Sequence, residues 1–83
     1  MTYALDIDPS AQEQIGALPD SALVALAEAF AFLQLVPWSG APYNRAKPDG
    51  SMRTLPFGSS GVITYLVVDD RERVDVLVVT WAE

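Results

Sequence analysis

The side chains best suited to chemistry lie in one stretch, "PYNRAKPDGSMRTLPFG", residues 42–58. It holds three of the five basic residues of the chain, Arg45, Lys47 and Arg53, and Tyr43 precedes them. Arginine offers a planar fork of donors to phosphate, and an aromatic ring offers a stacking surface to a base. If the loop folds back over the strand that carries Arg53, these four side chains form an RNA-binding site. The alternative stays open that Arg45 and Lys47 are ordinary loop residues and that Arg53 packs its stem across a sheet.

The charge of the whole chain limits what this basic stretch can do. The formal net charge is −6, whereas a general nucleic-acid binder is usually basic over the whole domain. Residues 45–53 hold three cations and one acid, so the remaining two cations and ten acids give −8. Three cations on a single strand imply a salt slope of about −2, so non-specific affinity for nucleic acid should be weak.

Several other chemistries can be set aside. The sequence has no cysteine and no histidine, which excludes disulfides, the usual zinc and haem ligands, and Ser-His or Cys-His nucleophiles. No glycine-rich phosphate loop leads into a helix. Two carboxylate pairs, Asp6 with Asp8 and Asp69 with Asp70, are expected to be solvated surface charges. We expect no metal and no cofactor.

Length and composition predict one globular domain over residues 1–83. The chain has 83 residues, of which 51% are hydrophobic and 19% charged. The start of the chain has no secretory-signal pattern, and the apolar stretch from Ala22 to Val36 is too short to span a bilayer. The absence of cysteine fits a reducing cytoplasm. We therefore expect a cytoplasmic protein without a membrane segment.

The first half of the chain predicts one strand and two helices. Residues 2–8 alternate between apolar and polar, which is typical of a half-buried strand. Ser10 and Glu13 fit a capping box for a short helix. Asp20 suits the N-cap of a second helix, and this helix is so apolar that we expect it to be buried on more than one side.

The second half predicts three strands that form a meander. They are residues 51–57, 62–68 and 74–81, joined by a Ser-Ser turn and a charged connection. Pro56 lacks a donor, so the first of them should be at an edge or bulged there. The order is therefore β-α-α-β-β-β, an α+β fold in which an antiparallel sheet is covered on one face by a helical hairpin.

Two long segments resemble the RelE/ParE superfamily of bacterial type II toxins. They are "LDIDPSAQEQIGALPDSALVALAEAFAFLQLVPW" and "MRTLPFGSSGVITYLVVDDRERVDVLVVTW". The family shows a strand, a helix of the form P-x-A-x-x-x-I/L-x-x-L, a second helix, a basic loop, then R-x-L, G-x-x-x-x-Y-x-V and V-x-V-L-x-V strands. The resemblance covers nearly the whole chain and implies a RelE/ParE-like fold with an antitoxin as partner.

The resemblance also implies roles for individual residues. Members that cut ribosome-bound mRNA use basic side chains to stabilise the phosphate as a ribose 2′-hydroxyl attacks. Arg53 matches the family's R-x-L arginine, and Arg45 and Lys47 fall in its basic loop. The sequence departs from the family at Val62, where an arginine is often found, and it shows no histidine or tyrosine after Trp81. Glu83 and Tyr43 are the only substitutes for a general acid or base.

Three functional hypotheses follow. The first is a metal-free endoribonuclease that cuts ribosome-bound mRNA with Arg53, Arg45 and Lys47. The second is a non-catalytic toxin that binds a protein target, as gyrase-poisoning members do. The third is a repurposed scaffold that contacts an antitoxin-like partner or a second copy of itself in a homodimer.

Overall fold

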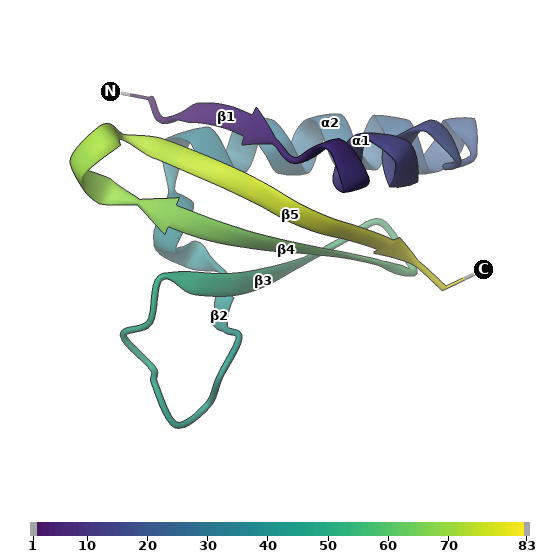
Figure 1. Cartoon of the computed structure of the whole chain (residues 1–83). Helices are drawn as coiled ribbons and strands as arrows, with labels where there is room; N and C mark the ends of the chain where they lie inside the picture. Colours follow the sequence, from purple (N-terminus) through teal and green to yellow (C-terminus); the bar gives the residue numbers. More distant parts are fainter. Residues whose placement is uncertain (1, 83) are drawn as a thin grey trace.

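The fold consists of a five-stranded sheet and two helices that cover one of its faces (Figure 1). The computed structural model describes residues 2–82. In chain order the elements are β1 (Ala4–Ile7), α1 (Pro9–Gly16), α2 (Asp20–Leu35), η1 (Pro37–Ser39), β2 (Ala41–Pro42), β3 (Met52–Phe57), β4 (Gly61–Val68), η2 (Asp69–Arg71) and β5 (Arg73–Trp81). The predicted α+β class, element order and helical layer are confirmed.

The sheet is mixed, which differs from the predicted antiparallel sheet. Its strand order is β1-β5-β4-β3-β2, and the three pairs β5–β4, β4–β3 and β3–β2 are antiparallel. β1 pairs with β5 in parallel, with Leu5 opposite Val74. The helical pair carries the chain back across the sheet before the meander begins, and this crossover permits the parallel pairing. The two-residue strand β2 was also not predicted.

A β-bulge in β5 decides which of its side chains face the helices. The pairing of β4 with β5 shifts between Thr64 and Tyr65, which face Val78 and Val76, so Leu77 is an extra residue. Val74 and Val76 are buried before the bulge, and Val79 is buried after it. Strict alternation would have turned Val79 to the other face, because side chains in a strand have a period of two.

The caps of the first helix differ from the predicted capping box. Asp8 is the N-cap of α1, and its carboxylate accepts hydrogen bonds from the Ser10 backbone nitrogen (3.1 Å) and hydroxyl (2.6 Å). Pro9 then occupies the first helical position, where its missing N–H costs nothing. For α2 the cap residue is Pro19, and Asp20 lies in the first turn, where a carboxylate favours the helix dipole.

The core lies between the helices and the inner face of the sheet. Its largest fully buried side chains are Tyr65, Leu33, Ile63, Val74 and Val76. α1 packs on β5, and α2 contacts both β3 and β1. Within residues 2–82, no α-helix covers the opposite face of the sheet (Figure 1).

Both edges of the sheet are protected from further strand pairing. At β1, the side chain and backbone of Gln34 bond the Tyr3 carbonyl (3.1 Å) and nitrogen (2.8 Å). At β3, the Met52 carbonyl faces β2, where it accepts from the Tyr43 nitrogen. Pro56 lies four residues after Met52, so its backbone nitrogen points to the same side of β3, beyond the end of the short strand β2. Its missing N–H donor therefore lies on the free edge, and the prediction that Pro56 lies at an edge is confirmed.

Candidate nucleic-acid interface

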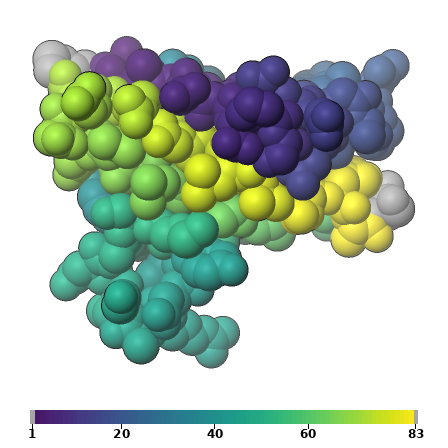
Figure 2. Space-filling view, viewed as in Figure 1, coloured from purple at the N-terminus to yellow at the C-terminus, as the bar shows by residue number. Residues whose placement is uncertain are grey.

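The predicted basic stretch forms a loop between β2 and β3 that projects from the body of the molecule (Figure 2). Two successive turns shape it: the Lys47 nitrogen donates to the Asn44 carbonyl and the Gly50 nitrogen to the Lys47 carbonyl, each at 2.9 Å. The Asn44 side chain also accepts from the Ala46 nitrogen at 3.0 Å. This Asx turn and the prolines limit the conformations of the loop.

Arg53 holds the base of this loop from the inner face of the sheet. Its side chain is only 9% exposed, and its guanidinium lies 5.3 Å from the centroid of the Trp38 ring. Nε donates to the Gly40 carbonyl at 3.0 Å. Nη1 donates to the carbonyls of Pro48 (3.2 Å) and Gly50 (3.0 Å). One buried cation therefore binds carbonyl oxygens at both ends of the loop.

Tyr65 lies opposite Arg53 in the neighbouring strand and holds the segment that enters the loop. Its buried hydroxyl donates to the Pro37 carbonyl at 2.8 Å and accepts from the Gly40 nitrogen at 3.1 Å. Burial raises the pKa of Tyr65 above its usual 10.0, although the Gly40 amide and the Arg53 charge act the other way. A Cβ on Gly40 would lie 2.5 Å from the Thr54 carbonyl oxygen and would also meet the Tyr65 hydroxyl, so glycine is required there.

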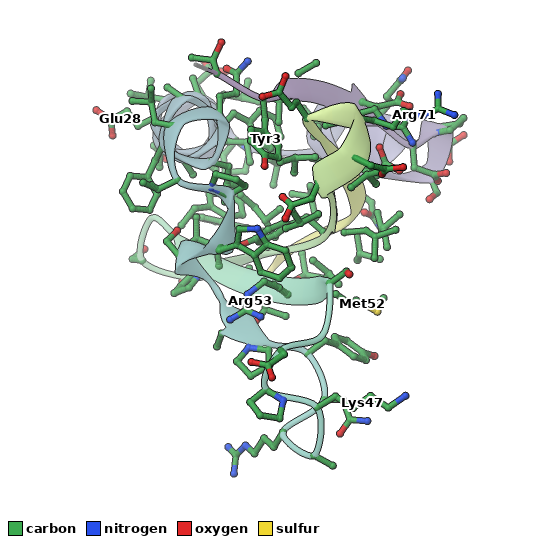
Figure 3. The ribbon with its side chains drawn as sticks, turned by 90° about the vertical axis from the view of Figure 1, so that its left-hand side faces the viewer. Tyr3, Glu28, Lys47, Met52, Arg53 and Arg71 are labelled. Carbon is green, nitrogen blue, oxygen red and sulfur yellow. The ribbon has the colours of Figure 1, made fainter. Side chains whose placement is uncertain are left out.

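Lys47 and Tyr43 meet at a hollow near the base of the loop. The hollow has a volume of about 330 Å³, which is within the range of ligand sites. Its lining residues are Tyr43, Asn44, Lys47, Gly50, Ser51, Met52 and Leu66. Tyr43 is 60% exposed, so much of its side chain is accessible to a stacking partner. The Lys47 side chain points away from Arg53 (Figure 3).

The structure therefore divides the four predicted site residues into two groups. Arg45, Lys47 and Tyr43 are exposed on the loop, whereas Arg53 is buried beneath it. Two accessible cations imply a salt slope of about −1.4 rather than −2. The role of Arg53 in catalysis stays a prediction, but the described contacts of its guanidinium are to backbone carbonyls and the Trp38 ring.

A second polar cluster joins three segments at the other end of η1. Asp69 Oδ1 accepts from the Tyr3 hydroxyl at 2.5 Å and from Trp38 Nε1 at 3.1 Å. These bonds correct the expectation that Asp69 is only a solvated charge. The pKa of Tyr3 is raised above 10.0, mainly by its hydrogen bond to Asp69. Loss of the tyrosine proton would break this bond and would place a negative phenolate oxygen against the negative carboxylate oxygen.

Other predicted positions have simpler outcomes. Val62, the family's arginine position, is 38% exposed on the open face of the sheet. Glu83, one candidate for the general acid or base, lies outside the described residues. Between residues 2 and 82, no helix combines the length and the apolar character that crossing a membrane requires.

Sequence reasoning missed the residues that support the loop, although one signal was available. Arg53, Leu55 and Phe57 alternate along β3, and the two apolar residues mark the core face of that strand. Arg53 shares this face, so its burial follows from the same periodicity. No local pattern predicts that Tyr65 and Gly40 support the loop, because their contact joins residues that are far apart in the sequence.

Comparisons with known proteins find similarity at the level of structure. No family model matches the chain. No curated protein matches its sequence. A chain of the M. tuberculosis RelBE2 toxin–antitoxin complex superposes with a TM-score of 0.83 at 23% identity, covering 99% of this chain and 93% of that one.

Two E. coli structures give the same result. A chain of the intact RelBE toxin–antitoxin complex has a TM-score of 0.81 at 24% identity, covering 98% of both chains. A double mutant of E. coli toxin RelE in the free state has a TM-score of 0.81 at 26% identity, covering 100% of this chain and 86% of that one. The described strands, helical pair and basic loop therefore form a fold of the RelE-like toxin superfamily.

Proposed function

We propose that this chain is the toxin of a type II toxin–antitoxin pair and that it binds ribosome-bound mRNA through the loop of residues 43–50. The single observation that carries the proposal is the loop that projects from the acidic body of the protein (Figure 2). This loop carries the exposed residues Arg45 and Lys47, and Lys47 lines the same hollow as Tyr43. In this arrangement the two cations would contact phosphate and the Tyr43 ring would stack on a base.

The chemistry we propose is attack of a ribose 2′-hydroxyl on the adjacent phosphate, without a metal. The 2′-oxygen gives up its proton and forms a 2′,3′-cyclic phosphate, while the P–O5′ bond breaks and the 5′-oxygen leaves as a hydroxyl after taking up a proton. Arg45 and Lys47 would stabilise the negative charge that develops on the phosphate oxygens. Arg53 would act indirectly, because its contacts fix the loop that carries these cations. With no histidine in the sequence, we assign the proton exchange to Tyr43, which lines the same hollow as Lys47.

Induction of the protein in a bacterium tests this function. Growth should stop, and primer extension should reveal cleaved messages. The double charge reversal Arg45→Glu with Lys47→Glu should restore growth, whereas Arg71→Glu, on the exposed η2 segment, should still arrest growth. Arrest that persists in the double variant would reject the loop as the RNA-binding element, and normal growth with the wild type would reject the toxin function.

The second candidate is a non-catalytic toxin that acts by binding a protein. It is favoured by the engagement of Arg53 with backbone carbonyls and by the lack of histidine. Growth arrest with intact messages would select this candidate, and a supercoiling assay would then test gyrase as its target.

We also propose an antitoxin as partner, because the two complexes described above pair toxin with antitoxin. Co-expression of a short reading frame adjacent to this gene should restore growth. Failure of every adjacent frame to do so would argue against a paired antitoxin.

A further inference from the structure

The outer face of α2 groups most of the large apolar side chains that are exposed on the described part of the chain. Nine large hydrophobic residues are exposed within residues 2–82, and five of them belong to α2 or its C-cap: Leu23, Val24, Phe32, Leu35 and Val36. Val24 and Leu35 are 65% and 64% exposed. Large apolar side chains grouped on one face mark interaction surfaces far more often than scattered ones do.

This face has the shape of a helix-docking surface. At 100° per residue, Val24, Ala31 and Leu35 fall along the middle of the exposed half of α2. Leu23 and Phe32 lie on its two sides, and the small residues Ala27 and Ala31 are exposed between them. The larger side chains form ridges, and the small alanines form a groove between these ridges. The side chains of a second helix can pack into such a groove.

Glu28 gives this apolar face its only charge. It is the single charged residue between Ser21 and Val36, and it lies near the middle of the helix, which runs from Asp20 to Leu35. The Glu28 side chain points away from the sheet (Figure 3). A partner that covers the face must therefore accommodate one carboxylate near its centre.

The position of Glu28 argues against a second copy of this chain as the occupant. A two-fold interface brings the same patch of both subunits together. With α2 packed centrally on α2, the two Glu28 carboxylates would face each other, and burying like charges is costly. The net charge of −6 adds repulsion between two copies.

We propose that the outer face of α2 docks an amphipathic helix of a partner protein that sets a lysine or arginine against Glu28. The proposal rests on the proposed function only for the identity of this partner, which would be the antitoxin. The apolar contacts supply affinity, and the central ion pair selects the partner and its register.

Two synthetic helical peptides test the proposal on the full chain. They share one apolar face and differ only at a central residue, arginine in one and glutamate in the other. The arginine peptide should bind at least tenfold more tightly than the glutamate peptide. In NMR spectra of the protein, the amide chemical shifts that change on binding should be those of α2. In the Glu28→Arg variant this preference should reverse. Equal binding of the two peptides, no binding, or shift changes on another face would overturn the proposal.

Two matched valine variants distinguish docking at α2 from non-specific hydrophobic binding of the peptide. Val24→Asp should abolish binding of the arginine peptide, whereas Val62→Asp, on the open sheet face, should leave it unchanged. Analytical ultracentrifugation should show a monomer for the wild type. If the wild type is instead a dimer and Val24→Asp is a monomer, a second copy of the chain occupies this face, and the proposal is overturned. Normal growth on induction would reject the proposed function without changing the peptide result, so the two failures are distinguishable.

Discussion

The Nε atom of Arg53 and the carbonyl oxygen of Gly40 are joined by a hydrogen bond of 3.0 Å across the start of the basic loop. The same guanidinium binds the Pro48 and Gly50 carbonyls at the loop's other end. Because Lys47 lies between these anchors, its position depends on a side chain that it does not contact in any described hydrogen bond. This dependence links the stability of the loop to the proposed binding of RNA.

Replacement of Arg53 by lysine should loosen the loop. A lysine ammonium is a compact charge and cannot reproduce the planar fork that spans three carbonyls. We expect a loss of about 2 to 3 kcal/mol in the free energy of unfolding, since buried hydrogen bonds to a charged group are lost. Trypsin should also cut faster after Arg45, and deuterium exchange should rise at the Lys47 and Gly50 amides. The control Arg71→Lys should change neither, and an unchanged cleavage rate in Arg53→Lys would disprove the clamp.

Replacement of Gly40 by alanine should be destabilising for a steric reason. The new Cβ would meet the Thr54 carbonyl and the Tyr65 hydroxyl, so the backbone must shift. We expect a cost of about 1 to 3 kcal/mol, typical of overpacking, measured by urea denaturation. The matched control is Gly16→Ala at the end of α1, where nothing lies within 4 Å of the added Cβ. That variant should gain about 0.5 to 1 kcal/mol through helix propensity; equal effects at the two sites would contradict the steric argument.

Replacement of Tyr65 by phenylalanine should leave the Pro37 carbonyl and the Gly40 amide without their buried partner. The expected cost is about 1 to 3 kcal/mol at neutral pH. Thermal or denaturant unfolding measures it, with Tyr43→Phe, an exposed tyrosine, as the control. A change below the error of that control would show that the hydroxyl is dispensable.

The pKa of Tyr65 also predicts how stability depends on alkaline pH. Because the folded pKa is raised above 10.0, the folded chain keeps this proton when the unfolded chain loses it. The stabilisation is fully present below pH 10 and is lost as the pH rises through the folded pKa. Tyr3 acts in the same direction. The free energy of unfolding should therefore fall less steeply above pH 10 in Tyr65→Phe than in the wild type, and parallel curves would refute the assignment.

Replacement of Asp69 by alanine should detach Trp38 and Tyr3 from their common acceptor. We expect a loss of about 1 to 2 kcal/mol, because two hydrogen bonds to a charged oxygen disappear. The fluorescence of Trp38 should shift as its indole becomes more mobile. The neighbouring variant Asp70→Ala is the control and should stay within about 0.5 kcal/mol of the wild type. An equal response of both variants would show that charge, and not hydrogen bonding, is responsible.

The sequence by itself determined the local structure of this protein. Period-two alternation predicted the strands, and the helical periodicity and prolines predicted the two helices between them. The prolines and Asp49-Gly50 also predicted the loop, which the structure shows between β2 and β3. These features depend on neighbours along the chain, so a single sequence carries them.

Only the tertiary structure decided how these parts meet. The parallel pairing of β1 with β5, the bulge at Leu77 and the contacts of Tyr65 with Gly40 join residues far apart in the sequence. Local periodicity placed Arg53 on a strand but did not show that loop carbonyls would surround it. Burial of a guanidinium requires partners for its donors, and here the folded loop supplies them. The physical reason is that long-range packing, rather than local preference, fixed which cations bind the protein itself and which remain exposed.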